Sequence, residues 1–336
     1  YIILSNIALN DGRYKIKLIK TDDQGNSLWT EIYPKFNLTR LDTSRLSRRA
    51  FGLLVLADGS YVLTGEDINF KTNQSQALVM TVGSEGNETN NKIYSFPFSG
   101  SVRGKAIIEN TSNGAPGYIV LGEVDNSVNN MVVAEINKSD LAQKWVRSYG
   151  SGQSALTNKL FLDSQGNIFF GGTVVRQNNR KVRLVKVRQD YQTTDFDLTI
   201  GDPQFNEFGN DICRYGFGFA VIGTTNKNGD NDILFQRLSE DGTVIGTPVI
   251  FPIKTTDGID VPGNKIYRLN AEGKPEVFVA DSGKASGLMF GADRQLYACQ
   301  NGDRKIVSYN AAGEMKTIAD DVDCNDLVVA RNGAIY

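Results

Sequence analysis

The sequence contains no histidine and only three cysteines among its 336 residues. Without histidine, the chain has no Ser-His-Asp or Cys-His catalytic group and no histidine-ligated metal. Cys213, Cys299 and Cys324 lie far apart and have no Cys-x-x-Cys spacing, which argues against a zinc site. Cys299 and Cys324 fall in predicted strands of neighbouring repeats, so two alternatives stay open for them, buried free thiols and a disulfide.

Long apolar runs and a strong charge of either sign are also missing. No run approaches the ~20 apolar residues that a membrane-spanning helix needs, so we predict no transmembrane segment. The net charge of -2 gives no basic field to attract nucleic acid or anionic lipid, and we predict no nucleic-acid partner. The local cluster of Arg45, Arg48 and Arg49 is interpreted as a solvated edge.

The sequence begins at Tyr1 and ends at Tyr336, each inside a predicted strand, and it shows no signal peptide. We therefore expect a fragment, or the ordered part of a longer chain. The missing signal peptide is then no argument for a cytoplasmic location.

Glycine is abundant, with 34 residues, and one phrase recurs along the chain. Residues 16–26, Ile-Lys-Leu-Ile-Lys-Thr-Asp-Asp-Gln-Gly-Asn, alternate apolar and polar side chains and then break into Asp, Gly and Asn. This pattern predicts a strand that runs into a tight turn. Further versions occupy residues 77–86, 233–242, 265–273 and 305–313, which indicates a repeat protein of short strands.

Four short strands in each unit of roughly fifty residues are typical of β-propeller blades. The clearest marker is the second strand of a unit, an unbroken apolar run that ends in glycine at residues 61–65, 118–122 and 219–223. Such a run predicts a strand buried on both faces, and the glycine predicts a bend or a close backbone approach. A β-sandwich is the alternative, and the regular period favours the propeller. We predict an all-β fold of four-stranded antiparallel blades, either about seven in one ring or two incomplete propellers.

Two family resemblances divide the chain. Residues 1–252, about five blades, resemble the propeller repeats of surface and secreted proteins of Bacteroidetes-type bacteria, through residues 18–29 and the closing phrase Trp-Val-Arg-Ser-Tyr-Gly at 145–150. Residues 253–336, about two incomplete blades, resemble the gluconolactonase and regucalcin-like propellers, through residues 260–269 and the phrases that follow them, at 287–293, 296–302 and 325–329.

The sequence predicts that the blade after the junction at residues 252–260 lacks a first strand. We predict that residues 255–259 either form a shortened replacement strand or adjoin residues absent from the sequence.

The second resemblance implies a candidate site. In the lactonase-like family a divalent cation, often calcium, is held by carboxylate and amide oxygens and polarises a lactone carbonyl for attack by water. The resemblance makes Asn325 the candidate metal ligand and Ser286 and Asn301 the candidate substrate-binding residues. Ser286 stands where the family has a second asparagine, and the family's Glu and late Asp ligands have no counterpart in the matching stretch.

Other carboxylates at predicted strand ends are interpreted as solvated turn acids, because turns favour Asp. They are Asp22, Asp23, Glu66, Asp67, Asp320 and Asp321.

Two functions follow as hypotheses. The first is an extracellular, cell-surface or periplasmic binding or scaffold module that recognises a protein or glycan partner at its loop face. The alternative is a calcium-dependent, gluconolactonase-like lactone hydrolase.

Overall fold

A computed structural model of the chain describes residues 1–336 except 35–45, 70, 99, 112–115, 126–129, 151–154, 177, 217, 230, 252–263, 270–274, 325, 326, 328, 330–334 and 336. In the described residues, the regular secondary-structure elements are β-strands, and their pairings are antiparallel. The predicted all-β class of antiparallel blades is therefore confirmed. The predicted strand or gap at residues 255–259 lies outside the described residues.

The chain divides into two compact units. The first unit comprises Tyr1–Leu4, Leu18–Glu31 and Ile253–Tyr336, and the second unit comprises Ser5–Lys17 and Ile32–Pro252. The division runs through a three-stranded sheet of β1 (Ile2–Ala8), β2 (Tyr14–Thr21) and β3 (Ser27–Tyr33). The assignment of two domains at residues 1–252 and 253–336 stays a prediction.

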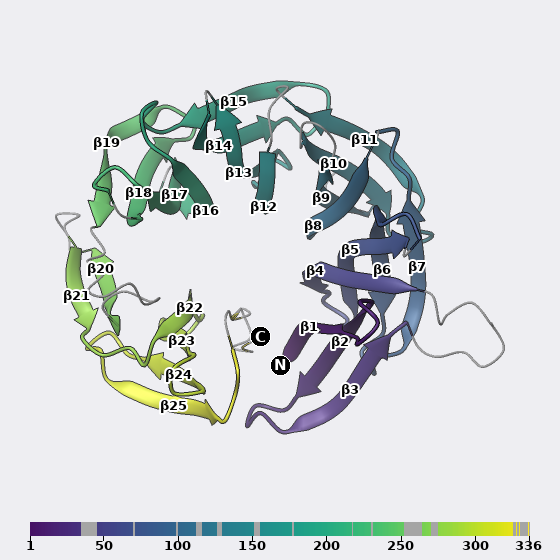
Figure 1. The fold of residues 1–336 in the computed structure, drawn as a ribbon, viewed down its shortest axis with the longest axis horizontal. Coiled ribbons are helices and arrows are strands. Elements are labelled where there is room, and N and C mark those ends of the chain that lie inside the picture. The colour runs from purple at the N-terminus through teal and green to yellow at the C-terminus, as the bar shows by residue number, and fades with distance from the viewer. Residues whose placement is uncertain are drawn as a thin grey trace. The chain divides into compact units, whose positions relative to one another are not determined.

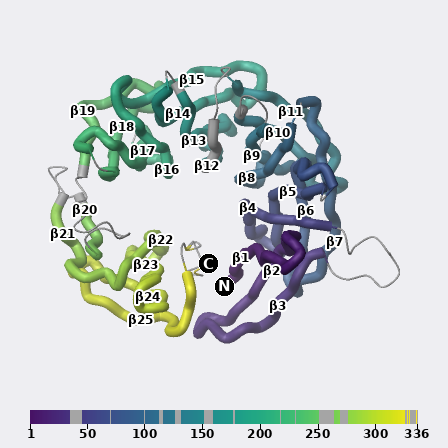
Figure 2. Tube along the Cα trace, viewed as in Figure 1, coloured from purple at the N-terminus to yellow at the C-terminus, as the bar shows by residue number. Residues whose placement is uncertain are grey.

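The second unit contains four consecutive four-stranded sheets, each with its strands in sequence order. Figures 1 and 2 show the chain passing from one sheet to the next, from blue through teal to green, with the first strand of each sheet on the inner side of the unit and the last strand on its outer side. The sheets are β4 (Ser47–Val55), β5 (Tyr61–Asn69), β6 (Gln74–Val82) and β7 (Glu88–Tyr94); β8 (Ser101–Asn110), β9 (Gly117–Asp125), β10 (Asn130–Asn137) and β11 (Gln143–Tyr149); β12 (Ala155–Leu162), β13 (Ile168–Arg176), β14 (Asn179–Val187) and β15 (Thr194–Ile200); and β16 (Glu207–Tyr215), β17 (Gly218–Thr225), β18 (Asp232–Ser239) and β19 (Val244–Phe251).

The first unit contains one further four-stranded sheet and a two-stranded sheet. About seven blades were predicted. In the described residues, six sheets have three or four strands and so form blades, and the seventh sheet has only two strands. Its strands are β20 (Ile266–Leu269) and β21 (Pro275–Val279), and the four-stranded sheet consists of β22 (Ala285–Phe290), β23 (Leu296–Gln300), β24 (Lys305–Tyr309) and β25 (Met315–Asp320).

The second strands β9 and β13 each lie between two hydrophobic clusters. In β9, Tyr118 and Val120 pack into the cluster shared with the preceding sheet, whereas Ile119 and Leu121 pack into the cluster shared with the following sheet. All four are at most 3% exposed. Burial on both faces explains why this run is apolar without alternation, and the prediction is confirmed for residues 61–65 and 118–122. At residues 219–223 it holds only in part, because Ile222 is 44% exposed.

A β-bulge interrupts the first strand of all five four-stranded sheets. The pairing with the second strand shifts at Phe51, Lys105, Asn158, Asn210 and Ser286. A bulge adds one unpaired residue and bends the strand, which brings its backbone close to the neighbouring strand.

In three of these sheets, a glycine of the second strand accommodates this approach. A Cβ atom on Gly65 would lie 1.9 Å from the carbonyl oxygen of Arg49, and one on Gly223 would lie 2.0 Å from that of Phe208. The predicted close approach is therefore confirmed, but these glycines do not end their strands. β5 continues beyond Gly65 to Asn69, because its pairing with β4 resumes beyond the bulge.

Candidate functional site

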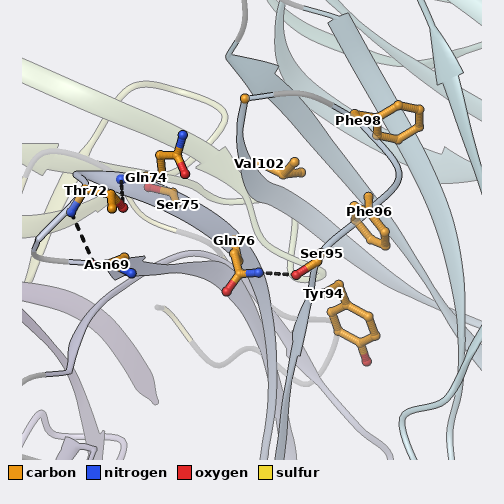
Figure 3. Close-up of a pocket in the computed structure, with 11 residues that line it drawn as sticks. Asn69, Thr72, Gln74, Ser75, Gln76, Tyr94, Ser95, Phe96, Phe98 and Val102 are labelled. Carbon is orange, nitrogen blue, oxygen red and sulfur yellow. Dashed lines mark hydrogen bonds between the residues drawn. The ribbon is translucent and has the colours of Figure 1, made fainter.

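A pocket of about 340 Å3 opens at one end of the sheet β4–β7, in the second unit. The β5–β6 turn, the end of β7 and the start of β8 form its walls. Figure 3 shows polar side chains on the side of the turn and aromatic rings along the chain that leads from β7 to β8. This volume falls at the lower end of the range of ~300–1,000 Å3 that is usual for small-ligand sites.

The aromatic wall is rigid at its base. Tyr94 and Phe96 are buried, and their rings stack with centroids 5.6 Å apart. The Tyr94 hydroxyl donates a hydrogen bond of 2.6 Å to the Leu141 carbonyl, and burial raises the pKa of this phenol, so it stays neutral. Phe98 is only half-buried and packs on the edge of the same hydrophobic cluster. Its ring is therefore the accessible member of the wall.

The polar wall comes from a turn that its own side chains stabilise. Asn69 Oδ1 accepts hydrogen bonds from the backbone N–H groups of Lys71 (3.0 Å) and Thr72 (3.3 Å). Gln74 and Gln76 are exposed at the start of β6, and the Gln76 amide donates to the Ser95 hydroxyl across the pocket (Figure 3). The turn and the start of β6 thus place amide and hydroxyl groups on the side of the pocket opposite the rings.

The corresponding place in the sheet β12–β15 is closed. The hydrogen bond from Ser75 N–H to Ser101 Oγ (2.9 Å) has its counterpart in that from Arg180 N–H to Asn206 Oδ1 (2.9 Å). The next residue there is Lys181, which is 4% exposed and donates to two backbone carbonyls of the β15–β16 connection. Where β14 has this buried lysine, β6 has the exposed Gln76, and the pocket stays open.

All eleven residues that line the pocket are uncharged. Amide groups both donate and accept hydrogen bonds, and hydroxyl groups do the same. Aromatic faces offer a flat apolar surface. The pocket can therefore hold an uncharged ligand that has several hydroxyl groups and one apolar face.

A second polar cluster in the second unit lies on the first and second strands of neighbouring sheets. The Glu66 carboxylate is fully buried and accepts hydrogen bonds from Arg49 Nε (2.6 Å) and Arg103 Nε (3.1 Å). Arg48 is 5% exposed and pairs with Asp67 at 2.6 Å. The interpretation of Glu66 and Asp67 as solvated turn acids is therefore wrong, as is that of Arg48 as part of a solvated edge.

Three of the other predicted turn acids, Asp22, Asp320 and Asp321, lie in turns or exposed ion pairs. Asp22 accepts hydrogen bonds from the backbone of Gln24 and Asn26 and from the Asn26 side chain, all within the β2–β3 turn, so the interpretation as a turn acid is confirmed for it. Asp320 and Asp321 form exposed ion pairs with Lys305 and Arg304.

The candidate lactonase residues are only partly described. Ser286 is the exposed bulge residue of β22, and Asn301 is exposed in the β23–β24 turn, at the same end of the sheet, because Ala285 pairs with Gln300. Asn325 lies outside the described residues. Among the described residues, no group of three or more Cys, Asp or Glu side chains is placed to hold a metal ion. The calcium site at Asn325, with Ser286 and Asn301 beside it, stays a prediction.

The reasoning from sequence missed the pocket. Its signals were present in the amide-rich turn at residues 69–76 and in the phrase Ser-Phe-Pro-Phe at 95–98. Neither signal resembles a known motif, and the walls meet only through the pairing of β6 with β7 and the packing of β8 beside them. Asn158 and Asn210 occupy the bulge position of β12 and β16, as Ser286 does in β22. This equivalence was not predicted from the sequence.

Comparison with solved structures places this geometry in a known fold. A streptogramin B lyase superimposes with a TM-score of 0.51 at 13% identity, covering 99% of this chain and 93% of that one. Virginiamycin B lyase from Staphylococcus aureus gives 0.51 at 15% identity, covering 83% and 88%. The chain has a β-propeller fold. An auxiliary nutrient binding protein from Bacteroides thetaiotaomicron gives 0.45 at 12% identity, covering 95% and 78%.

These identities show a shared fold and not a shared activity. No family model matches the propeller's sequence, and no curated protein matches it. In the part of the chain that the structure describes, no helix has the length and apolar character needed to cross a membrane.

Proposed function

We propose that this propeller is the binding module of an extracellular or cell-surface protein, and that the pocket between the β5–β6 turn and the β7–β8 connection holds an uncharged sugar residue of a glycan. The observation that carries the proposal is the lining, in which amide and hydroxyl groups face aromatic rings and no side chain is charged.

The chemistry of a sugar matches both walls. Its hydroxyl groups donate and accept hydrogen bonds, as the Gln74 and Gln76 amides do. Its C–H face is apolar and packs on a ring such as that of Phe98. A charged group would enter this pocket without a counter-charge, and burying an unpaired charge is strongly unfavourable.

The size of the pocket favours a glycan over a folded protein. A stable protein interface buries about 800 Å2 on each partner, whereas this pocket accommodates a group about the size of one sugar. A hexose has about 12 non-hydrogen atoms, and at ~0.3 kcal/mol for each atom it would bind with about 4 kcal/mol, a Kd near 1 mM. Useful affinity for a glycan would then need contacts beyond the pocket.

The test measures binding of neutral mono- and oligosaccharides by NMR titration, after a glycan array has selected the sugars. Gln76→Ala should raise Kd about fivefold, because one hydrogen bond contributes about 1 kcal/mol net. Phe98→Ala should weaken binding at least as much, since it removes the accessible ring. Gln165→Ala is the matched control, because Gln165 is an exposed glutamine in the turn of another blade.

Circular dichroism and thermal melting must show that each variant is folded. Absence of binding to every neutral sugar would contradict the proposal. So would binding that Gln76→Ala and Phe98→Ala leave unchanged, and a protein partner retained under the same conditions would then support protein recognition instead.

A further inference from the structure

Two of the three cysteines lie together in the first unit. Cys299 is fully buried in β23, and Cys324 is half-buried in the segment that follows β25. Cys324 packs against the hydrophobic cluster that contains Cys299. Cys324 was predicted to lie in a strand, which is wrong, because β25 ends at Asp320. No disulfide joins any of the three cysteines in this structure, and Cys213 is exposed.

Backbone contacts hold the Cys324 segment against the sheet. Val322 N–H donates to the Arg304 carbonyl at 2.8 Å, and the Cys324 thiol donates to the Lys305 carbonyl at 3.6 Å. Lys305 is adjacent to Ile306, which pairs with Cys299 across the β23–β24 ladder. Burial raises the pKa of the Cys324 thiol, and an interaction with the Cys299 side chain lowers it by a smaller amount. Both side chains therefore lie at the same hydrophobic cluster, and a disulfide requires such proximity of the two cysteines.

We propose that Cys299 and Cys324 are the two halves of a disulfide that closes when the chain meets a disulfide oxidant. The Cys324 thiolate, whose sulfur is the more accessible, attacks one sulfur of glutathione disulfide. A mixed disulfide forms and one glutathione thiolate leaves. The Cys299 thiol loses its proton and attacks the Cys324 sulfur, which forms the Cys299–Cys324 bond and releases the second glutathione. Two protein thiols are oxidised, and one glutathione disulfide is reduced to two thiols.

The burial of the two cysteines determines how fast the disulfide forms and how well it resists reduction. Burial raises the pKa of the Cys324 thiol, so little thiolate is present at neutral pH and closure is slow. Once formed, the bond is shielded from reducing thiols for the same reason. It links β23 to the segment beyond β25 and so fixes the end of the sheet β22–β25. A bond of this kind is retained in an oxidising compartment and is lost in a reducing one.

Cys213 serves as the internal control. It lies in β16 of the second unit, it is exposed, and neither of the other cysteines belongs to that unit. We therefore expect Cys213 to stay a free thiol or to carry a glutathione.

The experiment incubates the full chain, and its Cys213→Ser variant, with a buffer of oxidised and reduced glutathione. Alkylation under denaturing conditions and peptide mapping then identify the bonded residues. The expected result is one peptide pair that joins Cys299 to Cys324 in both proteins, and a melting temperature that rises by about 5 °C or more and falls again with dithiothreitol. Cys324→Ser should show neither change, and it disturbs the core less than a substitution of the buried Cys299.

Two results would overturn the inference. One is Cys324 that carries glutathione while Cys299 remains open to alkylation after denaturation. The other is crosslinking that depends on Cys213. Neither result depends on whether the pocket binds sugar.

Discussion

At the scale of single residues, the Glu66 carboxylate is a charged group buried in the interior of the second unit. Glu66 is fully buried, but its two carboxylate oxygens each meet a different arginine, Arg49 on β4 and Arg103 on β8. The arginines are partly exposed, with 31% and 24% of their side chains accessible, so they keep part of their hydration. Glu66 therefore joins two neighbouring blades through a carboxylate whose charge is compensated, which is the condition for burying it.

Removing this charge tests the assignment. Glu66→Gln should lower the free energy of unfolding by about 2 kcal/mol, less than the loss of 3–5 kcal/mol typical of a fully buried pair, because both arginines reach solvent. Asp125→Asn is the control, since Asp125 binds the same Arg103 at 3.0 Å but is 49% exposed. It should cost below about 1 kcal/mol. Urea unfolding measures both values, and equal losses would contradict the special role of Glu66.

At the scale of elements, the bulges of β4, β8 and β16 are coupled to Gly65, Gly122 and Gly223 on the strands paired with them. The bulge leaves one residue unpaired and turns the first-strand backbone toward its neighbour. At Gly65 the nearest backbone atoms would lie 1.9 Å and 2.6 Å from an added Cβ. Only a residue without a Cβ fits there unless the two strands separate.

Gly65→Ala should therefore cost about 3 kcal/mol or more, because the new methyl group meets backbone that cannot rotate away. Gly216→Ala is the contrasting variant. Gly216 has a φ of +59° and nothing within 4 Å of an added Cβ, so only conformational strain of about 1 kcal/mol is expected. Thermal and urea unfolding compare the two. A loss no greater for Gly65→Ala than for Gly216→Ala would show that β4 and β5 separate easily.

The strands and turns of this chain were predictable because each is encoded locally. The apolar run at residues 118–122 predicts a strand buried on two faces, and Asp22 predicts the turn in which it lies. The bulge could not be read in this way, because it depends on the pairing between strands. Glu66 was misinterpreted and the pocket was missed for the same reason. Arg103 lies 37 residues from Glu66, and the pocket walls meet through strand pairing and packing between segments distant in sequence.

For the whole molecule, the division into two compact units has a consequence for unfolding. Multidomain chains often lose the all-or-none transition of small domains. The chain has two tryptophans, Trp29 in the first unit and Trp145 in the second. Trp145 stacks on Tyr191 with ring centroids 4.8 Å apart and donates to Glu135 at 2.7 Å, so its fluorescence reports the packing of its own unit.

Two single-tryptophan proteins can therefore follow the units separately. Trp145→Phe leaves Trp29 as the probe of the first unit, and Trp29→Phe leaves Trp145 as the probe of the second. The Cys299–Cys324 bond would close a loop of 25 residues, the difference between the two numbers, and such a loop stabilises by about 3.5 kcal/mol in the chain-entropy model. Oxidation should then shift the urea midpoint reported by Trp29 and leave that of Trp145 unchanged. Gly65→Ala, which lies in the second unit, should do the reverse. If both probes shift together under either change, the two units unfold as one cooperative body.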